Sequence, residues 1–276
     1  TGGAPGGCER SGGRRLVTSD VTTDDETRLA GDMTLVDHLR ELRDRLVRSA
    51  LAILIGALLG WIFYERIFDF LTLPYCDAVG AKRGTCALTS FDPLEPFGFR
   101  AQVAAYSGIF FALPVIFYQL WRFIAPGLYR KEKVYAATFV VVSTTLFLAG
   151  AAVAYLTLPK ALEFLLSVGG EGINNLTNVT KYTTLVLFTM AAFGVGFEFP
   201  IVLIALQFVG IVQPSTLARW RREAVVGITA LAALITPSVD PISMFALAIP
   251  LYVFYEVSIL VGKLIVRRRE KALRSS

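Results

Sequence analysis

Long runs without charge dominate the middle of the chain. Four runs contain no Asp, Glu, Lys or Arg: 49–64, 101–121, 134–159 and 224–239. Two more contain a single carboxylate each: 182–218 and 241–262. A helix needs about 20 apolar residues to cross a hydrocarbon core of about 30 Å, and continuous apolar runs favour such helices over the alternating strands of a membrane barrel. The pattern predicts six membrane-spanning helices, at about 47–64, 101–122, 134–159, 182–210, 223–239 and 241–262.

The fifth of these predicted spans is short. Its charge-free run, 224–239, covers only about 24 Å at a rise of about 1.5 Å per residue. A helix of this length crosses most easily where the bilayer is thin. We therefore expect a short spanning helix and a locally thinned bilayer around it.

Composition supports a membrane protein. The chain has 276 residues, of which 54% are hydrophobic and 18% charged, against about 25% charged in soluble domains. The charges gather at the ends, with 17 of them in residues 1–48 and 7 in 263–276. So much apolar surface excludes disorder of the middle and disfavours a soluble domain. The expected fold class is an all-α polytopic membrane protein.

Lysine and arginine predict the orientation of the helices. The segments 32–48, 122–133, 219–222 and 263–276 hold 17 of these residues, and the segments on the other side hold six. Cytoplasmic loops carry the excess of Lys and Arg, so both termini are expected in the cytoplasm. The same bias explains the net charge of +5 without a nucleic-acid partner. We expect a disordered tail over 1–31, a membrane domain over 32–262 and a basic tail over 263–276.

An amphipathic helix is predicted just before the first span, over 34–46. Leucines at 35, 39, 42 and 46 recur with helical spacing, and charged residues fill the other faces. Thr34, followed three residues later by Asp37, is a plausible N-terminal cap. On periodicity alone, this segment is an ordinary anchor at the membrane interface.

Chemistry-bearing residues are few. Cys76 and Cys86 fall in the long loop 65–100 on the outer side, where they either form a disulfide or remain free thiols. His38 is the only histidine, which argues against metal sites rich in histidine and against most catalytic triads. We find no phosphate-binding loop and expect no cofactor, no metal and no enzymatic activity.

Two carboxylates lie within predicted spans. Glu198 stands mid-helix between glycines and Pro200, where a charged group costs on the order of 3 kcal/mol and is usually functional or turned inward. It is either part of a polar groove that faces substrate, a proton relay, or a carboxyl hydrogen-bonded between helices. Glu256 lies near the cytoplasmic end of the last span and is expected to reach the interface or to pair with the basic tail.

The stretch 112–133 resembles the cytoplasmic loop of the TatC family, a subunit of the twin-arginine protein translocase. That loop reads close to Pro-x-x-x-Tyr-Gln-x-Trp-x-Phe-x-x-Pro-Gly-Leu-Tyr-x-x-Glu. The matching residues are Pro114, Tyr118, Gln119, Trp121, Phe123, Pro126, Gly127, Leu128, Tyr129 and Glu132.

Other segments resemble the same family in the same order. The amphipathic helix is similar to the pattern His-Leu-x-Glu-Leu-Arg-x-Arg-Leu, through His38, Leu39, Glu41, Leu42, Arg43, Arg45 and Leu46. Further similar positions are Glu95 on the outer side, the segment 193–200 with Glu198, and the turn with Thr236, Pro237 and Asp240. The resemblance covers about 30–270; the glycine-rich tail and the two loop cysteines lie outside the pattern.

The resemblance implies a receptor for signal peptides with consecutive arginines. Guanidinium groups bind carboxylates through paired hydrogen bonds, and we expect Glu41 and Glu132 to receive the two arginines. Arg43 is expected to orient Glu41, and Phe123 to pack on an apolar residue of the signal peptide. As plain helix residues, Glu41 would instead pair with Arg45 four positions on, and Glu132 would sit in the first turn of the third span.

The resemblance also implies the setting of this receptor. We expect a curved helical scaffold with a concave face in the cytoplasmic membrane of a bacterium, self-assembly in a receptor complex, and single-span partners of the TatA and TatB type. The proton motive force would drive transport, and the apolar signal segment would enter a groove near Glu198.

Two other classes of function remain as alternatives. A secondary transporter of a small solute would use Glu198 as its coupling carboxylate and would show internal repeats with paired broken helices, but no convincing repeat is visible. An intramembrane enzyme would need a nucleophile and a base, and no such set is found.

Overall fold

The computed structural model describes residues 2, 35–80, 88–124, 133–168, 177–236 and 240–274. Within these ranges, the side chains of 35–38, 123–124, 133–136, 208–209 and 268–274 are not described. The chain divides into two units, 1–44 and 45–276, and each is considered by itself.

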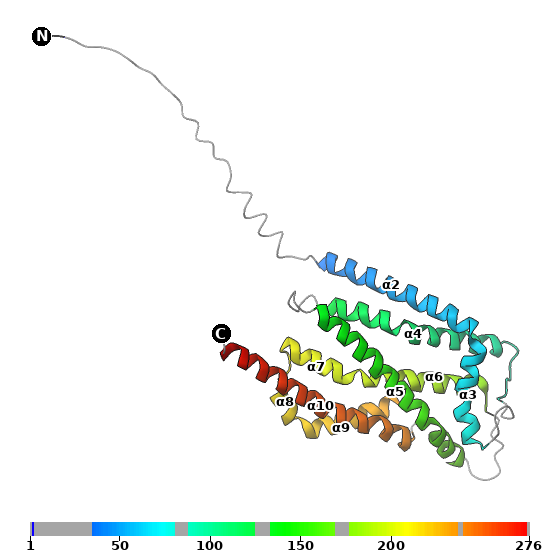
Figure 1. The fold of residues 1–276 in the computed structure, drawn as a ribbon. Coiled ribbons are helices and arrows are strands. Elements are labelled where there is room, and N and C mark those ends of the chain that lie inside the picture. Colours follow the sequence, from blue (N-terminus) through cyan, green and yellow to red (C-terminus); the bar gives the residue numbers. More distant parts are fainter. Residues whose placement is uncertain are drawn as a thin grey trace. The chain divides into compact units, whose positions relative to one another are not determined.

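Helices make up nearly all of the described chain (Figure 1). They are α2 (Leu35–Ile62), α3 (Tyr64–Ala78), α4 (Glu95–Ile124), α5 (Lys133–Val168), α6 (Val179–Phe197), α7 (Phe199–Val209), α8 (Pro214–Arg219), α9 (Arg221–Ile235) and α10 (Pro241–Arg274). The only β-type pairing in the described ranges is an isolated bridge between Thr89 and Asn178. The prediction of an all-helical fold is confirmed.

Five helical segments are long and apolar enough to cross a membrane, among the residues that the structure describes. They are Leu39–Ile62, Glu95–Arg122, Ala137–Val168, Val179–Gln207 and Pro241–Arg267. The fourth combines α6 and α7. Helix α9, in the region of the short fifth predicted span, has 15 residues, or about 22 Å at the usual rise, and does not reach that length.

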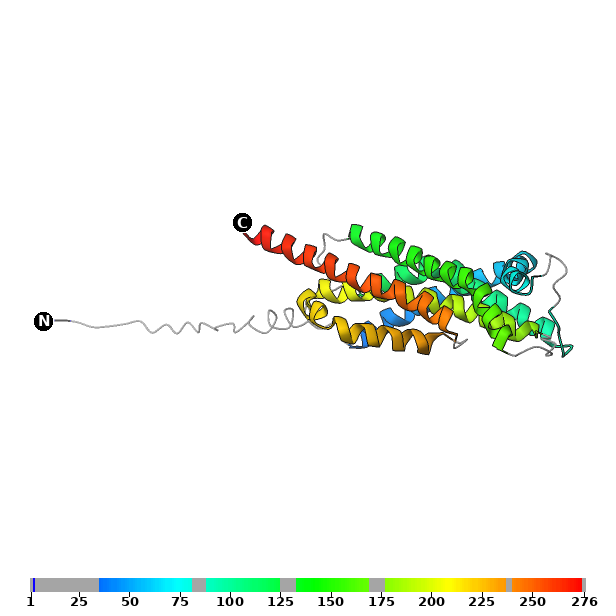
Figure 2. The same ribbon diagram turned by 90° about the horizontal axis from the view of Figure 1, so that it is seen from below.

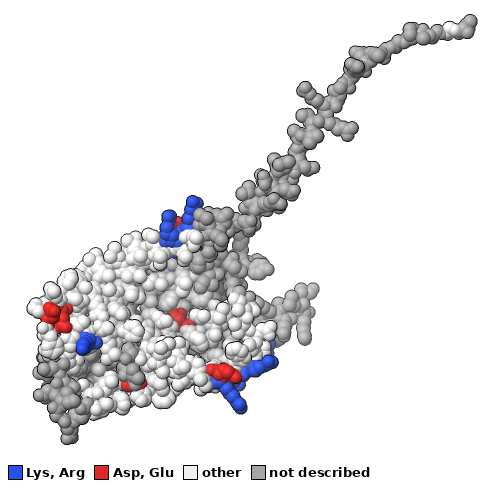
Figure 3. Space-filling view, turned by 180° about the vertical axis from the view of Figure 1, so that it is seen from behind, with Lys and Arg blue, Asp and Glu red and all other residues white. Residues whose placement is uncertain are grey.

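Figure 3 shows how charge is distributed on one face of the molecule. Most of the coloured side chains lie at its margins, and a broad area between them is uncharged. Such a surface suits a protein whose helices face hydrocarbon, because charged side chains in the bilayer core are costly.

Helix α3 lies within the region that the sequence analysis treats as a loop. Its buried residues include Leu71, Pro74 and Tyr75, and Ile67 and Ala78 pack against the same cluster. These positions recur with the spacing of a helix that buries one face.

Two distant tyrosines donate to backbone carbonyls of α3, and a proline explains the first of these contacts. Pro74 has no N–H, so the carbonyl of Phe70 lacks its usual partner four residues on. The Tyr155 hydroxyl of α5 donates to that carbonyl at 2.8 Å, and the Tyr182 hydroxyl of α6 donates to the carbonyl of Leu71 at 2.6 Å. The two bonds fix α3 against α5 and α6.

The break between α6 and α7 occurs at Glu198. Pro200 occupies the start of α7 and cannot donate a backbone hydrogen bond, which ends the preceding helix. The N–H of Glu198 bonds to the carbonyl of Val195 at 3.1 Å, a tightened last turn. The sequence Gly-Phe-Glu-Phe-Pro therefore places a carboxylate at a helix break.

Helices α5 and α6 pack closely and antiparallel (Figures 1 and 2). A Cβ added to Gly150 would meet the carbonyl oxygen of Phe193 at 2.6 Å, and one added to Gly194 would meet the ring of Phe147 at 2.6 Å. Only glycine allows the two backbones to approach so closely at these positions.

The last helix completes the membrane domain. Helix α10 contacts α5, α7, α8 and α9, and it contributes Leu247, Leu251 and Ile259 to a buried apolar cluster. Near its middle, the Tyr255 hydroxyl donates to the carbonyl of Leu217 in α8 at 2.7 Å. The short helices α8 and α9 are thereby held against α10.

Candidate functional site

Basic side chains gather at one end of the second unit, which we call the basic end. In Figure 1, the last turn of α4, helix α8 and the far part of α10 lie at this end, and α3 lies at the opposite end. The exposed cations of this end are Arg122, Arg219, Arg221, Arg222, Lys263 and Arg267. The last turn of α4 precedes residues 125–132, which lie outside the described part of the chain.

Two of the predicted binding residues lie in the first unit. Glu41 is half-buried in α2, and Arg43 is exposed. The Arg43 guanidinium pairs with the neighbouring Asp44, at 3.0 Å from Nη2 to Oδ1. That Arg43 orients Glu41 stays a prediction.

Several of the predicted residues lie outside the described part of the chain. They are Pro126, Gly127, Tyr129, Glu132 and Cys86, together with the side chains of His38 and Phe123.

Arg45 of the amphipathic motif and Gln119 of the loop motif are both buried and are in contact. Arg45 is 9% exposed, and its Nη1 donates to the carbonyl of Gln119 at 3.4 Å. Gln119 is buried as well, whereas Pro114 is exposed on α4. Arg45 therefore fixes the end of α4 just before the loop, a role that the sequence analysis did not assign.

Trp121 anchors the end of α4 to α5. Its ring stacks on that of Phe139, with centroids 4.3 Å apart, and its indole Nε1 donates to the hydroxyl of Ser143 at 3.2 Å. Together with Leu113, Phe117, Phe147 and Ile201, Trp121 belongs to a buried cluster of α4, α5 and α7.

Glu198 is half-buried at the break between α6 and α7. Its carboxyl interacts with the side chain of Ser143. Its Oε1 atom is buried and finds no hydrogen-bond partner in the described part of the chain. The sequence places Glu198 mid-helix, whereas the structure places it at a helix break, in contact with a serine that the sequence did not single out. That Glu198 forms part of an intramembrane groove stays a prediction.

Glu95 ties two segments together at the end near α3. Its Oε2 accepts hydrogen bonds from the hydroxyl of Ser90 at 2.9 Å and from the N–H of Phe91 at 2.8 Å. Its Oε1 accepts from the side-chain amide of Asn178 at 2.8 Å. Asn178 in turn caps α6 by accepting from the N–H of Lys181 at 2.9 Å. Glu95 therefore links the starts of α4 and α6.

An arginine packs on aromatic rings where α2 ends. The guanidinium of Arg100 lies 4.8 Å from the ring centre of Trp61 and 5.0 Å from that of Tyr64, in the geometry of a cation–π contact. Burial raises the pKa of Tyr64 to about 12, so its phenol is neutral at physiological pH.

Asp240 caps α10. It is 1% exposed, and its Oδ2 accepts from the N–H of Ser243 at 2.6 Å. Pro241 follows as the first helical residue, which completes a common pattern for the start of a helix.

The cap yields a stability prediction. We expect Asp240→Ala to lower the free energy of unfolding by at least about 1 kcal/mol, because the N–H of Ser243 loses its acceptor in a buried position. Thermal unfolding of the protein in lipid nanodiscs measures the effect. Asp240→Asn, which keeps an oxygen acceptor, should lose less; an equal loss in both variants would assign the effect to charge and not to capping.

Glu256 pairs with a neighbouring short helix. Its Oε2 lies 2.8 Å from Nη2 of Arg221 at the start of α9, and its Oε1 accepts from the Tyr252 hydroxyl at 3.4 Å. The pair is partly exposed, and such pairs contribute at most about 1 kcal/mol.

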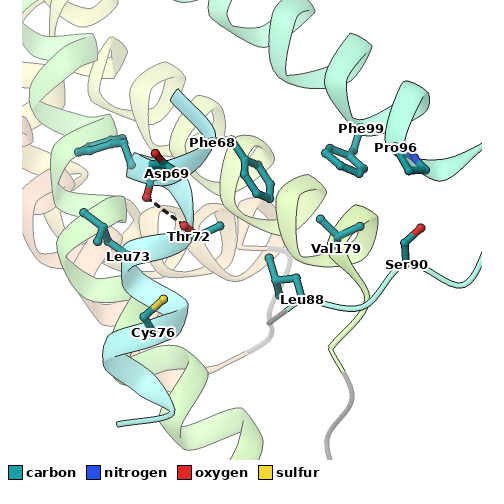
Figure 4. A pocket seen from close by; sticks show the side chains of 11 residues that line it. Phe68, Asp69, Thr72, Leu73, Cys76, Leu88, Ser90, Pro96, Phe99 and Val179 are labelled. Carbon is teal, nitrogen blue, oxygen red and sulfur yellow. Dashed lines mark hydrogen bonds between the residues drawn. The ribbon is translucent and has the colours of Figure 1, made fainter. Parts of the chain in front are cut away.

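A pocket of about 870 Å³ opens beside α3 (Figure 4). Phe68, Leu88 and Phe99 give it an apolar lining, with polar groups from Asp69, Thr72 and Ser90. Cys76, which also borders it, is buried and disulfide-bonded; its pairing with Cys86 stays a prediction. The pocket lies at the opposite end from the last turn of α4.

The described residues contain no group of three or more His, Cys, Asp or Glu side chains that could hold a metal ion. The chemistry of the basic end is that of charge pairing and apolar contact. Apolar spans, a basic end and a carboxylate at a helix break define a polytopic helical membrane protein.

Comparisons with known proteins identify the family. The family model for the Sec-independent protein translocase protein (TatC) matches residues 37–250. A relative of this name from Frankia casuarinae is 39% identical over 263 residues, which cover 92% of this chain and 72% of that protein. One from Aquifex aeolicus is 38% identical over 242 residues, 87% of this chain and 98% of that protein. The chain belongs to the TatC family.

A solved structure agrees with this assignment. The crystal structure of a twin-arginine translocase receptor, TatC, is 39% identical in sequence and has a TM-score of 0.66. The match covers 82% of this chain and 98% of that one. The resemblance seen in the sequence motifs is therefore confirmed.

Proposed function

We propose that this chain is the signal-peptide receptor and core subunit of a twin-arginine translocase, which exports folded proteins across a bacterial cytoplasmic membrane by means of the proton motive force. The observation that carries the proposal is the match to a receptor of this kind over 98% of the receptor's length. The motif residues of that family, among them Glu41 and Glu132, stand at their expected places in the sequence.

Glu41 and Glu132 receive the two arginines of the signal peptide. Each guanidinium can donate two parallel hydrogen bonds to a carboxylate. Arg43 orients Glu41, and Phe123 packs on the apolar residue that follows the arginines. The burial of Arg45 and Trp121 supports the proposal, because a binding loop needs rigid helix ends on which to stand.

The basic end faces the cytoplasm, with both termini on that side. The excess of Lys and Arg at this end supports the orientation. Helix α9 serves as a sixth span in spite of its length, and its 15 residues would favour a thin bilayer around it.

The apolar segment of the signal peptide enters a concave face of the helical scaffold near Glu198. The break between α6 and α7 supports this route, because it places a carboxyl with an unpaired oxygen at membrane depth. Single-span subunits of the TatA and TatB type join the complex, which contains several copies of the receptor.

Peptide binding tests the receptor role. The full chain in lipid nanodiscs is titrated with a twin-arginine signal peptide and with the same peptide carrying two lysines. Lysine has no planar fork of donors, so we expect its peptide to bind at least about tenfold more weakly. Equal affinity for both peptides would overturn the receptor proposal.

The alternative of a small-solute transporter finds no support in the comparisons, since the family and the relatives named above are protein translocase components. Solute uptake by proteoliposomes that contain this chain alone would revive it.

A further inference from the structure

Trp121, Ser143 and Glu198 connect three helical segments of the second unit. They lie on α4, on α5 and at the break between α6 and α7. Trp121 is 8% exposed and Ser143 is 0% exposed, so water does not compete for their polar groups.

The chemistry of the indole decides the direction of the hydrogen bonds. An indole N–H is a donor only, so the oxygen of Ser143 accepts from Trp121 at 3.2 Å. The serine hydroxyl proton then needs an acceptor elsewhere, and the group that the side chain contacts is the carboxyl of Glu198.

Neighbouring hydroxyls on α5 behave differently. Thr144 and Thr145 donate to carbonyls of their own helix, those of Val140 and Val141, at 2.8 Å each. This local bond is the usual choice of a hydroxyl inside a helix. Ser143 instead accepts from one helix and contacts the carboxyl at the edge of another.

Close packing fixes the geometry of this contact. Along the antiparallel pair, Ser143 faces Glu198, Phe147 faces Gly194, and Gly150 faces Phe193. The two glycines hold the backbones together within one to two turns of the serine. The alignment of Ser143 with Glu198 is therefore set by the helix pair and not by a flexible side chain.

We propose that Ser143 is a positioning residue for Glu198, and that Trp121 fixes the direction of the serine hydroxyl. The hydrogen bond from Trp121 to Ser143, together with the contact of Ser143 with Glu198, links this carboxyl to the end of α4, four residues before position 125. The role of these contacts in transport rests on the function proposed above. A signal peptide bound by the segment after α4 would act on Glu198 through Trp121 and Ser143.

Infrared spectroscopy tests the hydrogen bonds directly. The band that Glu198→Gln removes from the spectrum of the nanodisc-embedded protein belongs to the Glu198 carboxyl. We expect Ser143→Ala and Trp121→Phe to move this band, and Ser143→Thr to restore its position by returning the hydroxyl. The matched controls Thr144→Ala and Trp220→Phe should leave it in place, since Thr144 bonds to its own helix and Trp220 is 60% exposed. A band unmoved by Ser143→Ala would overturn the proposal.

Transport and binding, measured side by side, test the role. Leaving a buried polar group without its partner shifts an equilibrium by about 5- to 150-fold, so we expect Ser143→Ala and Trp121→Phe to reduce export of a twin-arginine cargo by at least about fivefold. In Ser143→Ala, which leaves Trp121 and the loop residues in place, peptide affinity should stay close to that of the unmodified chain. Unchanged export in variants whose band has moved would overturn the positioning role. If the unmodified chain binds no twin-arginine peptide, the receptor function fails, and the infrared result still decides whether the hydrogen bonds exist.

Discussion

Replacing Glu132 with glutamine is expected to weaken the binding of a twin-arginine signal peptide by roughly 30- to 4000-fold, which corresponds to about 2–5 kcal/mol. The substitution keeps the shape of the side chain and removes the charge. The arginine guanidinium bound at this position would then face an amide, which offers one neutral acceptor oxygen where the carboxylate offers two charged ones. Titration of labelled peptide into nanodiscs that contain the full chain measures the loss.

Glu41→Gln should give a loss of the same order, since each carboxylate receives one arginine. The two losses can be assigned with peptides that carry a single arginine-to-lysine change. Each singly changed peptide is then titrated against both carboxylate variants. The variant whose carboxylate faces the changed arginine should lose less additional affinity than the other variant, because the bidentate pair at that position is already gone.

Glu223→Gln is the matched control. Glu223 is an exposed carboxylate at the start of α9, at the basic end of the molecule. Its replacement should change peptide affinity little. If Glu223→Gln costs as much as Glu132→Gln, the peptide responds to the total charge of this face and not to two defined carboxylates.

The sequence predicts the five long apolar helices because hydrocarbon imposes a strict rule. Every backbone polar group must be satisfied within the segment, so a long charge-free run leaves few structures other than a helix. Helix α3 escaped this reasoning because it mixes charged and apolar residues and contains Pro74. Its helical period at Ile67, Leu71, Tyr75 and Ala78 was a usable signal, and the proline was misleading because Tyr155 satisfies the freed carbonyl.

The site was predicted unevenly for a related reason. Motifs identify residues that are near one another in sequence, and they singled out Trp121 and Glu198 separately. The residue that joins them, Ser143, belongs to no motif and lies 22 positions from Trp121. Likewise, the sequence presented Arg45 as a motif member and as a partner for Glu41, and its contact with the Gln119 carbonyl 74 positions away depends on how α2 packs on α4. Such contacts follow from helix packing, which local patterns do not specify.

Gly150→Ala tests that packing, and we expect it to lower the free energy of unfolding by about 1–3 kcal/mol. The added Cβ would lie 2.6 Å from the carbonyl oxygen of Phe193 and 2.8 Å from the ring of Phe197. A ring can turn aside, but a helix backbone cannot, so α5 and α6 must move apart. Thermal unfolding in nanodiscs measures the loss of stability.

The same variant should also disturb the contact between Ser143 and Glu198, because Gly150 lies about two turns along α5 from Ser143. We therefore expect Gly150→Ala to move the infrared band of the Glu198 carboxyl as well as to lower stability. Gly98→Ala on α4 is the control, since nothing lies within 4 Å of its added Cβ and alanine is the better helix former by about 1 kcal/mol. A Gly150→Ala protein as stable as Gly98→Ala would show that α5 and α6 tolerate separation, and the alignment of Ser143 with Glu198 could not then depend on their close approach.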